Sequence, residues 1–221
     1  MNDNIKNSQG VDSILGDPKK ALWKMSIPLI ISLLITSLYS VIDAIWVSGL
    51  GADALAGVGF VSPIFIALMG IGNGLGAGSA SSLSKYIGEE NRQKANNGAI
   101  HTIFITVIIS VITTVLLLLF LKDILLGMGA GSTIGYAMDY GLILSIGSIL
   151  VILSNALYGV LRGEGDASRT MYAMLFSSIL NMILDPVFIF GLKMGTAGAA
   201  LATAISQCVS FVALLWCFLK K

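Results

Sequence analysis

The stretch NGAIHTIFITVIISVITTVLLLLFL, residues 97–121, contains 25 consecutive residues without a single Asp, Glu, Lys or Arg. An α-helix rises 1.5 Å per residue, so a helix of this length extends over about 37 Å. The hydrocarbon core of a bilayer is about 30 Å thick, and an apolar helix of this length can cross it. The stretch therefore predicts a membrane-spanning helix.

Five further stretches have the same character. Hydrophobic residues make up 56% of the 221 residues, charged residues make up 11%, and the mean hydropathy is +0.89. Soluble domains carry about 25% charged residues, so this composition excludes a soluble globule. The net charge of +1 argues against nucleic-acid binding. We expect an all-α membrane protein whose six transmembrane helices form one lobe within residues 21–221, at about 22–50, 59–86, 97–121, 136–161, 170–190 and 196–219.

The distribution of basic residues predicts the orientation of these helices. If the N-terminus is placed in the cytoplasm, 11 of the 13 Lys and Arg residues fall in cytoplasmic segments, and only Lys122 and Lys193 fall outside. Cytoplasmic loops of membrane proteins carry such an excess of positive charge. We therefore expect a multi-pass protein of the plasma (inner) membrane, with residues 1–20 as a cytoplasmic N-terminal segment and the C-terminus also cytoplasmic.

Two acidic residues, Asp43 and Asp185, lie far from the predicted helix ends. A carboxylate at the centre of a membrane helix costs about 2.5–3.5 kcal/mol to insert, so it usually faces a cavity or a partner. Asp43 lies eight residues before Gly51, and Asp185 lies eight residues before Lys193. Both therefore lie about 12 Å from the outer boundary. The structural alternative for each is a hydrogen bond between helices.

Other polar side chains are predicted at the same depth. Thr203 lies seven residues into the sixth helix, and Asn181 precedes Asp185 by one turn on the same face. Carboxylate, amide and hydroxyl oxygens are hard ligands, suited to a proton or to a small cation such as Na⁺. Two carboxylates close together in a low-dielectric medium are not expected to be ionised together, and they titrate as a coupled pair. We predict an H⁺ or Na⁺ site formed by Asp43, Asn181, Asp185 and Thr203.

Three more polar residues lie within the predicted spans. Gln207 is one turn from Thr203 and either extends the polar patch or hydrogen-bonds to another helix. Asn155 and Tyr158 lie in the cytoplasmic half of the fourth helix. They either line a cavity or hydrogen-bond to neighbouring helices.

Prolines interrupt three of the predicted helices. Pro28 and Pro63 lie inside the first and second helices, and Pro186 directly follows Asp185. Proline cannot donate a backbone hydrogen bond and clashes with the carbonyl four residues earlier, so it kinks a helix. We interpret Pro28 and Pro186 as hinges at which helices bend during a functional cycle.

Two glycine motifs suggest functions that the sequence context argues against. The run GIGNGLGAG at 70–78 resembles a dinucleotide-binding loop, but no strand precedes it, so we expect it to allow close helix packing. The run GEGD at 163–166 matches a pattern of intramembrane aspartyl proteases. Asp166, however, falls in a loop between Arg162 and Arg169, where a turn with local charge pairs is expected.

Several motifs together resemble one known family. They are VIDAIW at 41–46, KYIG at 85–88, LRGEGD at 161–166, LNMILDPVFIF at 180–190 and GTAGAALATAISQ at 195–207. In this combination, residues 13–221 resemble the multidrug and toxic compound extrusion (MATE) family of efflux transporters.

The resemblance implies a secondary antiporter rather than an enzyme. Such a protein exports cationic amphipathic compounds in exchange for H⁺ or Na⁺ and needs no cofactor beyond this coupling ion. The resemblance also implies that Asp43, Asn181, Asp185 and Thr203 bind the ion and that the first helix bends at Pro28. One alternative is a related flippase or exporter of lipid-linked or peptide cargo, and another is a transport-inactive half fragment.

The resemblance covers one half of the family's architecture. The family has twelve spans in two six-helix lobes, whereas this sequence supplies the N-terminal six and contains no internal repeat. The expected partners are therefore the lipid bilayer, organic cations, and either the missing C-terminal lobe or a second copy of this chain in parallel orientation.

Overall fold

The computed structural model describes residues 18–219, and within them the side chains of 19–20 and 22–216. It is all-helical over this part of the chain, and six helices are long and apolar enough to span a membrane. Two short turns, η2 (Gly131–Thr133) and the π-helical η3 (Val187–Gly191), precede α5 and follow α6. The long helices are α2 (Pro18–Ser48), α3 (Ala52–Gly88), α4 (Arg92–Gly127), α5 (Ile134–Gly163), α6 (Ala167–Pro186) and α7 (Gly195–Leu219).

Several helices begin earlier or end later than the apolar stretches suggested. Helix α3 begins at Ala52 rather than near residue 59, because Gly51 turns the chain with φ +105° and Asp53 favours the positive end of the helix dipole. Helix α4 continues through Lys122 and Asp123 to Gly127. Charged residues at a membrane boundary do not break a helix, so hydropathy alone places these ends too far inward.

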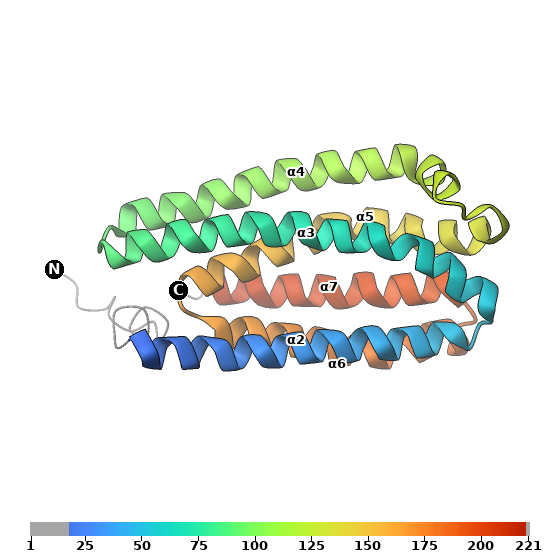
Figure 1. Ribbon diagram of the computed structural model, residues 1–221, viewed down its shortest axis with the longest axis horizontal. Helices are drawn as coiled ribbons and strands as arrows, with labels where there is room; N and C mark the ends of the chain where they lie inside the picture. Colours follow the sequence, from blue (N-terminus) through green and yellow to red (C-terminus); the bar gives the residue numbers. More distant parts are fainter. Residues whose placement is uncertain (1–17, 220–221) are drawn as a thin grey trace.

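Helix α5 lies inside the bundle and packs mainly against α3, α4 and α7. In Figure 1, α3 and α4 lie along one side, α2 and α6 along the other, and α5 and α7 between them. The most apolar stretch of α5 is 78% buried, whereas that of α2 is 6% buried. Helix α2 packs mainly along α6, and α6 packs against α7. These contacts bring α2, α6 and α7 together, which are the three helices that carry the predicted ion ligands.

Glycines let α3 and α5 approach each other closely. A Cβ built on Gly159 would lie 2.2 Å from the Cα of Gly76, and one on Gly72 would lie 2.7 Å from the Cβ of Asn155. The predicted close packing of the 70–78 run is therefore confirmed for Gly72 and Gly76. Gly70, Gly74 and Gly78, by contrast, have no neighbour within 4 Å of an ideal Cβ.

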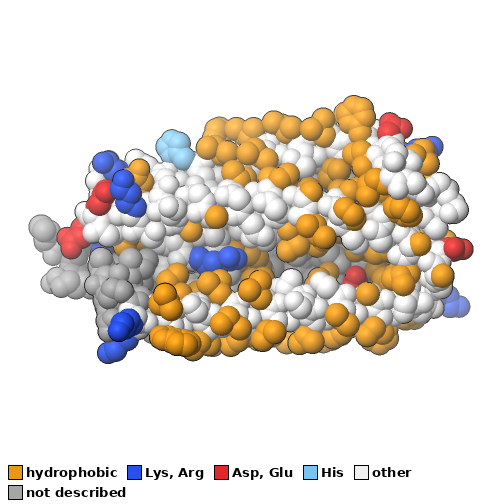
Figure 2. Space-filling view, in the orientation of Figure 1, with side chains coloured by type: hydrophobic (Ala, Val, Ile, Leu, Met, Phe, Trp, Pro, Cys, Tyr) orange, Lys and Arg blue, Asp and Glu red, His pale blue; other side chains and the backbone are white. Residues whose placement is uncertain are grey.

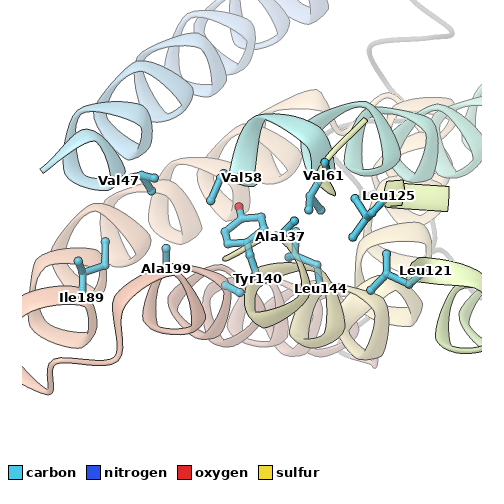
Figure 3. Packing of buried hydrophobic residues seen from close by; sticks show 12 residues of the cluster. Val47, Val58, Val61, Leu121, Leu125, Ala137, Tyr140, Leu144, Ile189 and Ala199 are labelled. Carbon is cyan, nitrogen blue, oxygen red and sulfur yellow. The ribbon is translucent and has the colours of Figure 1, made fainter. Parts of the chain in front are cut away.

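A hydrophobic cluster closes the end of the bundle at which α2 joins α3 and α4 leads to α5. Figure 3 shows its side chains converging from several helices, with Tyr140 among them. Large apolar side chains also cover the outer surfaces of the helices, and charged side chains gather mainly at the two ends (Figure 2). The molecule thus has the surface of a membrane protein. The cluster contains Val47, Val58, Val61, Leu121, Leu125, Ala130, Ala137, Tyr140, Leu144, Ile189, Ala199 and Ala200.

Candidate ion site

The structure brings the four predicted ion ligands together. Asp43 comes from α2, Asn181 and Asp185 from α6, and Thr203 from α7. Asp185 is 0% exposed, and Asn181 and Thr203 are each 2% exposed. Asp43 is half-buried. A polar cluster at this depth agrees with the placement argued from helix length.

Asn181 links the two neighbouring helices through its amide. With the nitrogen directed toward the carboxylate, it donates to Asp185 Oδ2 at 2.9 Å, and its oxygen accepts from Thr203 N at 3.1 Å and Thr203 Oγ1 at 3.3 Å. The opposite orientation would point the amide oxygen at the carboxylate, so hydrogen bonding selects this one. Asn181 therefore fixes the position of Asp185 relative to α7.

The two carboxyl groups face each other. Asp43 and Asp185 lie within hydrogen-bonding reach, and Oδ1 of Asp43 is buried without a hydrogen-bond partner among the described residues. Two carboxylates in contact repel each other strongly in a low-dielectric interior unless a proton or a cation lies between them. The geometry therefore fits a shared proton, or a small cation that takes its place.

Two tyrosines that the sequence analysis did not assign to the site also belong to it. The Tyr39 hydroxyl lies 3.4 Å from Thr203 Oγ1. Tyr140 is 7% exposed and lies beside Asp43, Asp185 and Thr203. Tyr39 precedes Asp43 by one turn, which is a signal that could have placed it on the same face. The position of Tyr140 depends on how α5 crosses α2 and α7, and the sequence does not contain that information.

The site is covered toward the loop that joins α2 and α3. Trp46, one turn beyond Asp43, packs edge-on against Phe190 with ring centroids 6.3 Å apart. Phe190 lies in the π-helical turn that follows Pro186, the last residue of α6. A Cβ on Gly49 would lie 3.0 Å from the Phe190 ring, so Gly49 makes room for it. The aromatic pair separates the carboxylates from this end of the bundle.

A cavity of about 150 Å³ adjoins the site on its other side. Residues from α2, α3, α5, α6 and α7 line it, and the predicted cavity residues Asn155, Tyr158 and Gln207 are among them, together with Tyr39, Asn181 and Thr203. Figure 2 shows a groove between the two sides of the bundle, with an acidic side chain visible on its floor. The ion site and the cavity therefore communicate.

Pro28 lies away from this centre. It is buried within α2, and its carbonyl accepts a hydrogen bond from Ser32 Oγ at 2.8 Å. Fifteen residues separate it from Asp43, which corresponds to about 22 Å along the helix. Any influence of Pro28 on the site must therefore act through the shape of α2.

Asp166 has the structural role that its loop position predicted. It is the N-cap of α6, and its side chain accepts from the backbone N–H of Arg169 at 3.2 Å. The same carboxylate forms an ion pair with the side chain of Arg169, Nε to Oδ2 3.2 Å. Asp166 therefore caps the helix, and the GEGD run forms the turn between α5 and α6.

Comparison with known proteins identifies the family. The family model MatE matches residues 28–187, which is more than half of the chain. The chain belongs to the MATE family. We can therefore compare the six-helix bundle and the acidic pair with other MATE proteins.

Relatives within the MATE family are about twice as long as this chain. The multidrug export protein MepA of Staphylococcus saprophyticus is 30% identical over 204 residues, which cover 91% of this chain and 45% of MepA. MepA of Staphylococcus aureus is 29% identical over the same length. The chain therefore spans about half the length of the curated relatives it matches.

Solved MATE structures agree with the fold. The chain matches the crystal structure of a MATE in the straight conformation with 39% identity and a TM-score of 0.92, over 96% of this chain and 48% of the other. It matches a MATE in the bent conformation with 38% identity and a TM-score of 0.90, over 95% and 47% of the two chains. A MOP superfamily transporter from Pyrococcus furiosus gives 39% identity and a TM-score of 0.92, over 96% and 48%.

Proposed function

We propose that this chain is the N-terminal lobe of a secondary antiporter that exports cationic amphipathic compounds in exchange for H⁺ or Na⁺. The observation that carries the proposal is the buried pair Asp43 and Asp185, facing each other beside a cavity inside a bundle of membrane-length helices. Membership of the MATE family and similarity to proteins named for multidrug export support it.

The acidic pair couples the two ion movements because a proton and a cation compete for the same binding site. With a proton between them, the two carboxyl groups carry one negative charge. When the proton leaves, two adjacent negative charges remain, and they attract a cation strongly in this low-dielectric setting. Asn181, Thr203 and Tyr39 contribute further oxygen ligands or hydrogen bonds. A proton and another cation therefore exclude each other at the site.

Movement of α2 and α6 is the second part of the proposal. Pro28 in α2 and Pro186 at the end of α6 are the proposed hinges. Each lacks a backbone N–H, and Pro186 lies next to a π-helical turn, a feature that often accompanies bending. Bending α2 at Pro28 would change the distance between Asp43 and Asp185, because they lie on different helices.

The second half of the transport pathway requires another lobe. We propose that the groove beside α2 faces either a C-terminal six-helix lobe or a second copy of this chain, and that substrates pass between the two. The charge distribution favours insertion in the plasma membrane with the N-terminus and the C-terminus of the chain both cytoplasmic.

Dye transport across the membrane of vesicles tests this function directly. Membrane vesicles that contain the chain together with a C-terminal six-helix lobe are loaded with a fluorescent cationic dye, and an H⁺ or Na⁺ gradient is imposed. Dye movement that depends on either gradient is the expected result. Flipping of a labelled lipid without dye movement would support the flippase alternative, and neither activity would identify a transport-inactive half; both results contradict the proposal.

The hydroxyl of Thr203 provides a finer test of the ion site. We expect Na⁺ to raise the unfolding temperature of the original protein, because a ligand that binds the folded state raises its stability, and we expect Thr203→Val to lose most of this rise. Removing this buried hydroxyl should also cost about 1–2 kcal/mol of stability, since Tyr39 and Asn181 lose a partner.

The matched control is Thr114→Val. Thr114 forms a buried hydroxyl–hydroxyl hydrogen bond of 2.6 Å with Ser148, between α4 and α5. This variant should lose similar stability and keep the Na⁺ effect. An equal Na⁺ effect in Thr203→Val and Thr114→Val would remove Thr203 from the ion site.

A further inference from the structure

The end of the cavity away from the carboxylates contains buried polar groups without partners. Ser206 is 2% exposed, and its Oγ has no hydrogen-bond partner among the described residues. The same holds for Oε1 of Gln207. The backbone carbonyl of Ser206 accepts a hydrogen bond from Ser177 Oγ at 2.8 Å. Ser206, Gln207 and Ser177 all line the cavity. Buried polar atoms in this situation are usually satisfied by water.

The cavity has room for such water. Its volume of about 150 Å³ corresponds to about five molecules, at roughly 30 Å³ for each water in the liquid. Asn181 and Thr203 line the cavity next to the carboxylates, Ser206 and Gln207 line it about one turn further along α7, and Tyr158 lines it from α5. A chain of waters can therefore run from the hydrogen-bond partners of Asp185 to the hydroxyl of Tyr158.

A pair of hydroxyl groups lies beside the cavity, one turn of α7 beyond Ser206. The Tyr158 hydroxyl is hydrogen-bonded to Ser210 Oγ, and the two residues are 5% and 0% exposed. Ser210 lies seven residues after Thr203 on α7, so the pair is about 10 Å from the level of the ion site. Because Tyr158 lines the cavity, this hydrogen bond between α5 and α7 adjoins it.

Arg162 lies beyond this pair, one turn after Tyr158 on α5. Its side chain is half-buried, and its Nε is buried without a hydrogen-bond partner among the described residues. The adjacent Gly163 packs against Ala80, since a Cβ there would lie 2.6 Å from the Ala80 Cα. Ala80 lies eight residues before the end of α3 at Gly88. The positive charge of Arg162 is therefore recessed from the end of the bundle by about 12 Å of α3.

We propose that the hydrated cavity and the Tyr158–Ser210 hydrogen bond form a proton pathway from the acidic pair to the end of the lobe at which α2 begins. This proposal rests on the proposed function, because it assumes that Asp43 and Asp185 hold a proton. It assigns to Tyr158 and Ser210 a role in proton transfer that is distinct from ion binding.

The transfer balances at each oxygen. The acidic pair gives its proton to a cavity water, and this water passes one of its own protons to the Tyr158 oxygen as the Tyr158 hydroxyl proton moves to Ser210 Oγ. Ser210 then releases its former proton to water on the far side. Tyr158, Ser210 and each cavity water gain one O–H bond and lose one, the acidic pair loses one proton and the far-side water gains it, without oxidation or reduction.

The pathway discriminates between the two candidate coupling ions. Tyr158 and Ser210 are in hydrogen-bond contact, so no space remains between them for Na⁺. The guanidinium of Arg162 repels Na⁺ and an excess proton alike, so the discrimination rests on the Tyr158–Ser210 contact. A proton can cross by exchange of hydroxyl protons, whereas a metal ion would need to separate α5 from α7. On this side of the lobe, therefore, the coupling ion is the proton.

Hydrogen–deuterium exchange of the shared acid proton tests the pathway. The purified chain is placed in lipid nanodiscs, where lipid covers the groove, and transferred rapidly to D₂O. Infrared spectroscopy then follows the C=O stretch of the protonated carboxyl group as O–H becomes O–D. We expect Tyr158→Phe and Ser210→Ala each to slow this exchange by about tenfold, the effect of losing one hydrogen-bonded step.

Two kinds of control separate the possible failures. Ser148→Ala breaks the hydroxyl pair with Thr114 outside the cavity and should leave the exchange rate unchanged. If it slows exchange equally, or if Tyr158→Phe and Ser210→Ala both exchange at the original rate, the pathway is wrong while the acidic pair stands. If the original protein shows no such band, or if the band survives in the double variant Asp43→Asn with Asp185→Asn, the shared proton and the pathway are both wrong.

Discussion

Asp185→Asn is expected to abolish proton release when a cation binds. In the original protein, Na⁺ or an organic cation should displace about one proton per chain, because the coupled pair shares one. The amide that replaces the carboxyl group in this variant keeps the shape of the side chain but cannot carry or release that proton. The measurement is the absorbance change of a pH dye when the cation is added to purified protein in weakly buffered solution.

The control for this experiment is Asp139→Asn. It makes the same chemical change at an exposed carboxylate on α5 and should leave the released proton unaffected. Asp43→Asn, by contrast, should match Asp185→Asn, because either change leaves a single carboxylate. Proton release of the original size from both Asp43→Asn and Asp185→Asn would show that the acidic pair is not the ion site.

Among the described glycines, Gly159→Ala is expected to cause the largest loss of stability. The new Cβ would lie 2.2 Å from the Gly76 Cα and 2.3 Å from its carbonyl carbon. Backbone atoms cannot rotate away, so α3 and α5 must separate along their contact. Adding atoms to a well-packed interior typically costs about 1–3 kcal/mol, and we expect about 3 kcal/mol or more here.

Thermal or denaturant unfolding in detergent checks this expectation against Gly74→Ala. Gly74 lies on the same α3 helix as Gly76, but an ideal Cβ there meets nothing within 4 Å. Because alanine favours helix by up to about 1 kcal/mol over glycine, Gly74→Ala should be neutral or slightly stabilising. Equal stability of the two variants would mean that α3 and α5 do not touch at Gly76 and Gly159.

Much of the ion site could be predicted because depth in a membrane follows from residue number. The eight-residue spacings from Asp43 to Gly51 and from Asp185 to Lys193 placed both carboxylates at one level, and the structure has them facing each other. The spacing says nothing about the direction in which a side chain points around its helix. Tyr140 illustrates this limit, since the sequence analysis does not assign it to the site, whereas the structure buries it beside Asp43.

The glycine run at 70–78 also shows which features the sequence predicts and which it does not. Its composition predicted close helix packing, which holds for Gly72 and Gly76. The sequence does not indicate which of the two glycine faces meets α5, because both have the same four-residue spacing. The difference arises only when the large apolar side chains of α5 and α4 determine how α3 is rotated.

By itself, the sequence determined the six membrane-length helices and the common depth of the acidic residues, because both depend on hydropathy and on the fixed rise of an α-helix. The tertiary structure alone decided that α2 lies along α6, that Asn181 bridges Asp185 to Thr203, and that the cavity is lined by Tyr158, which is hydrogen-bonded to Ser210. These features depend on the rotation and crossing of helices far apart in the chain. Side-chain packing between helices determines how each helix is rotated about its axis, and this rotation cannot be predicted from local periodicity in the sequence.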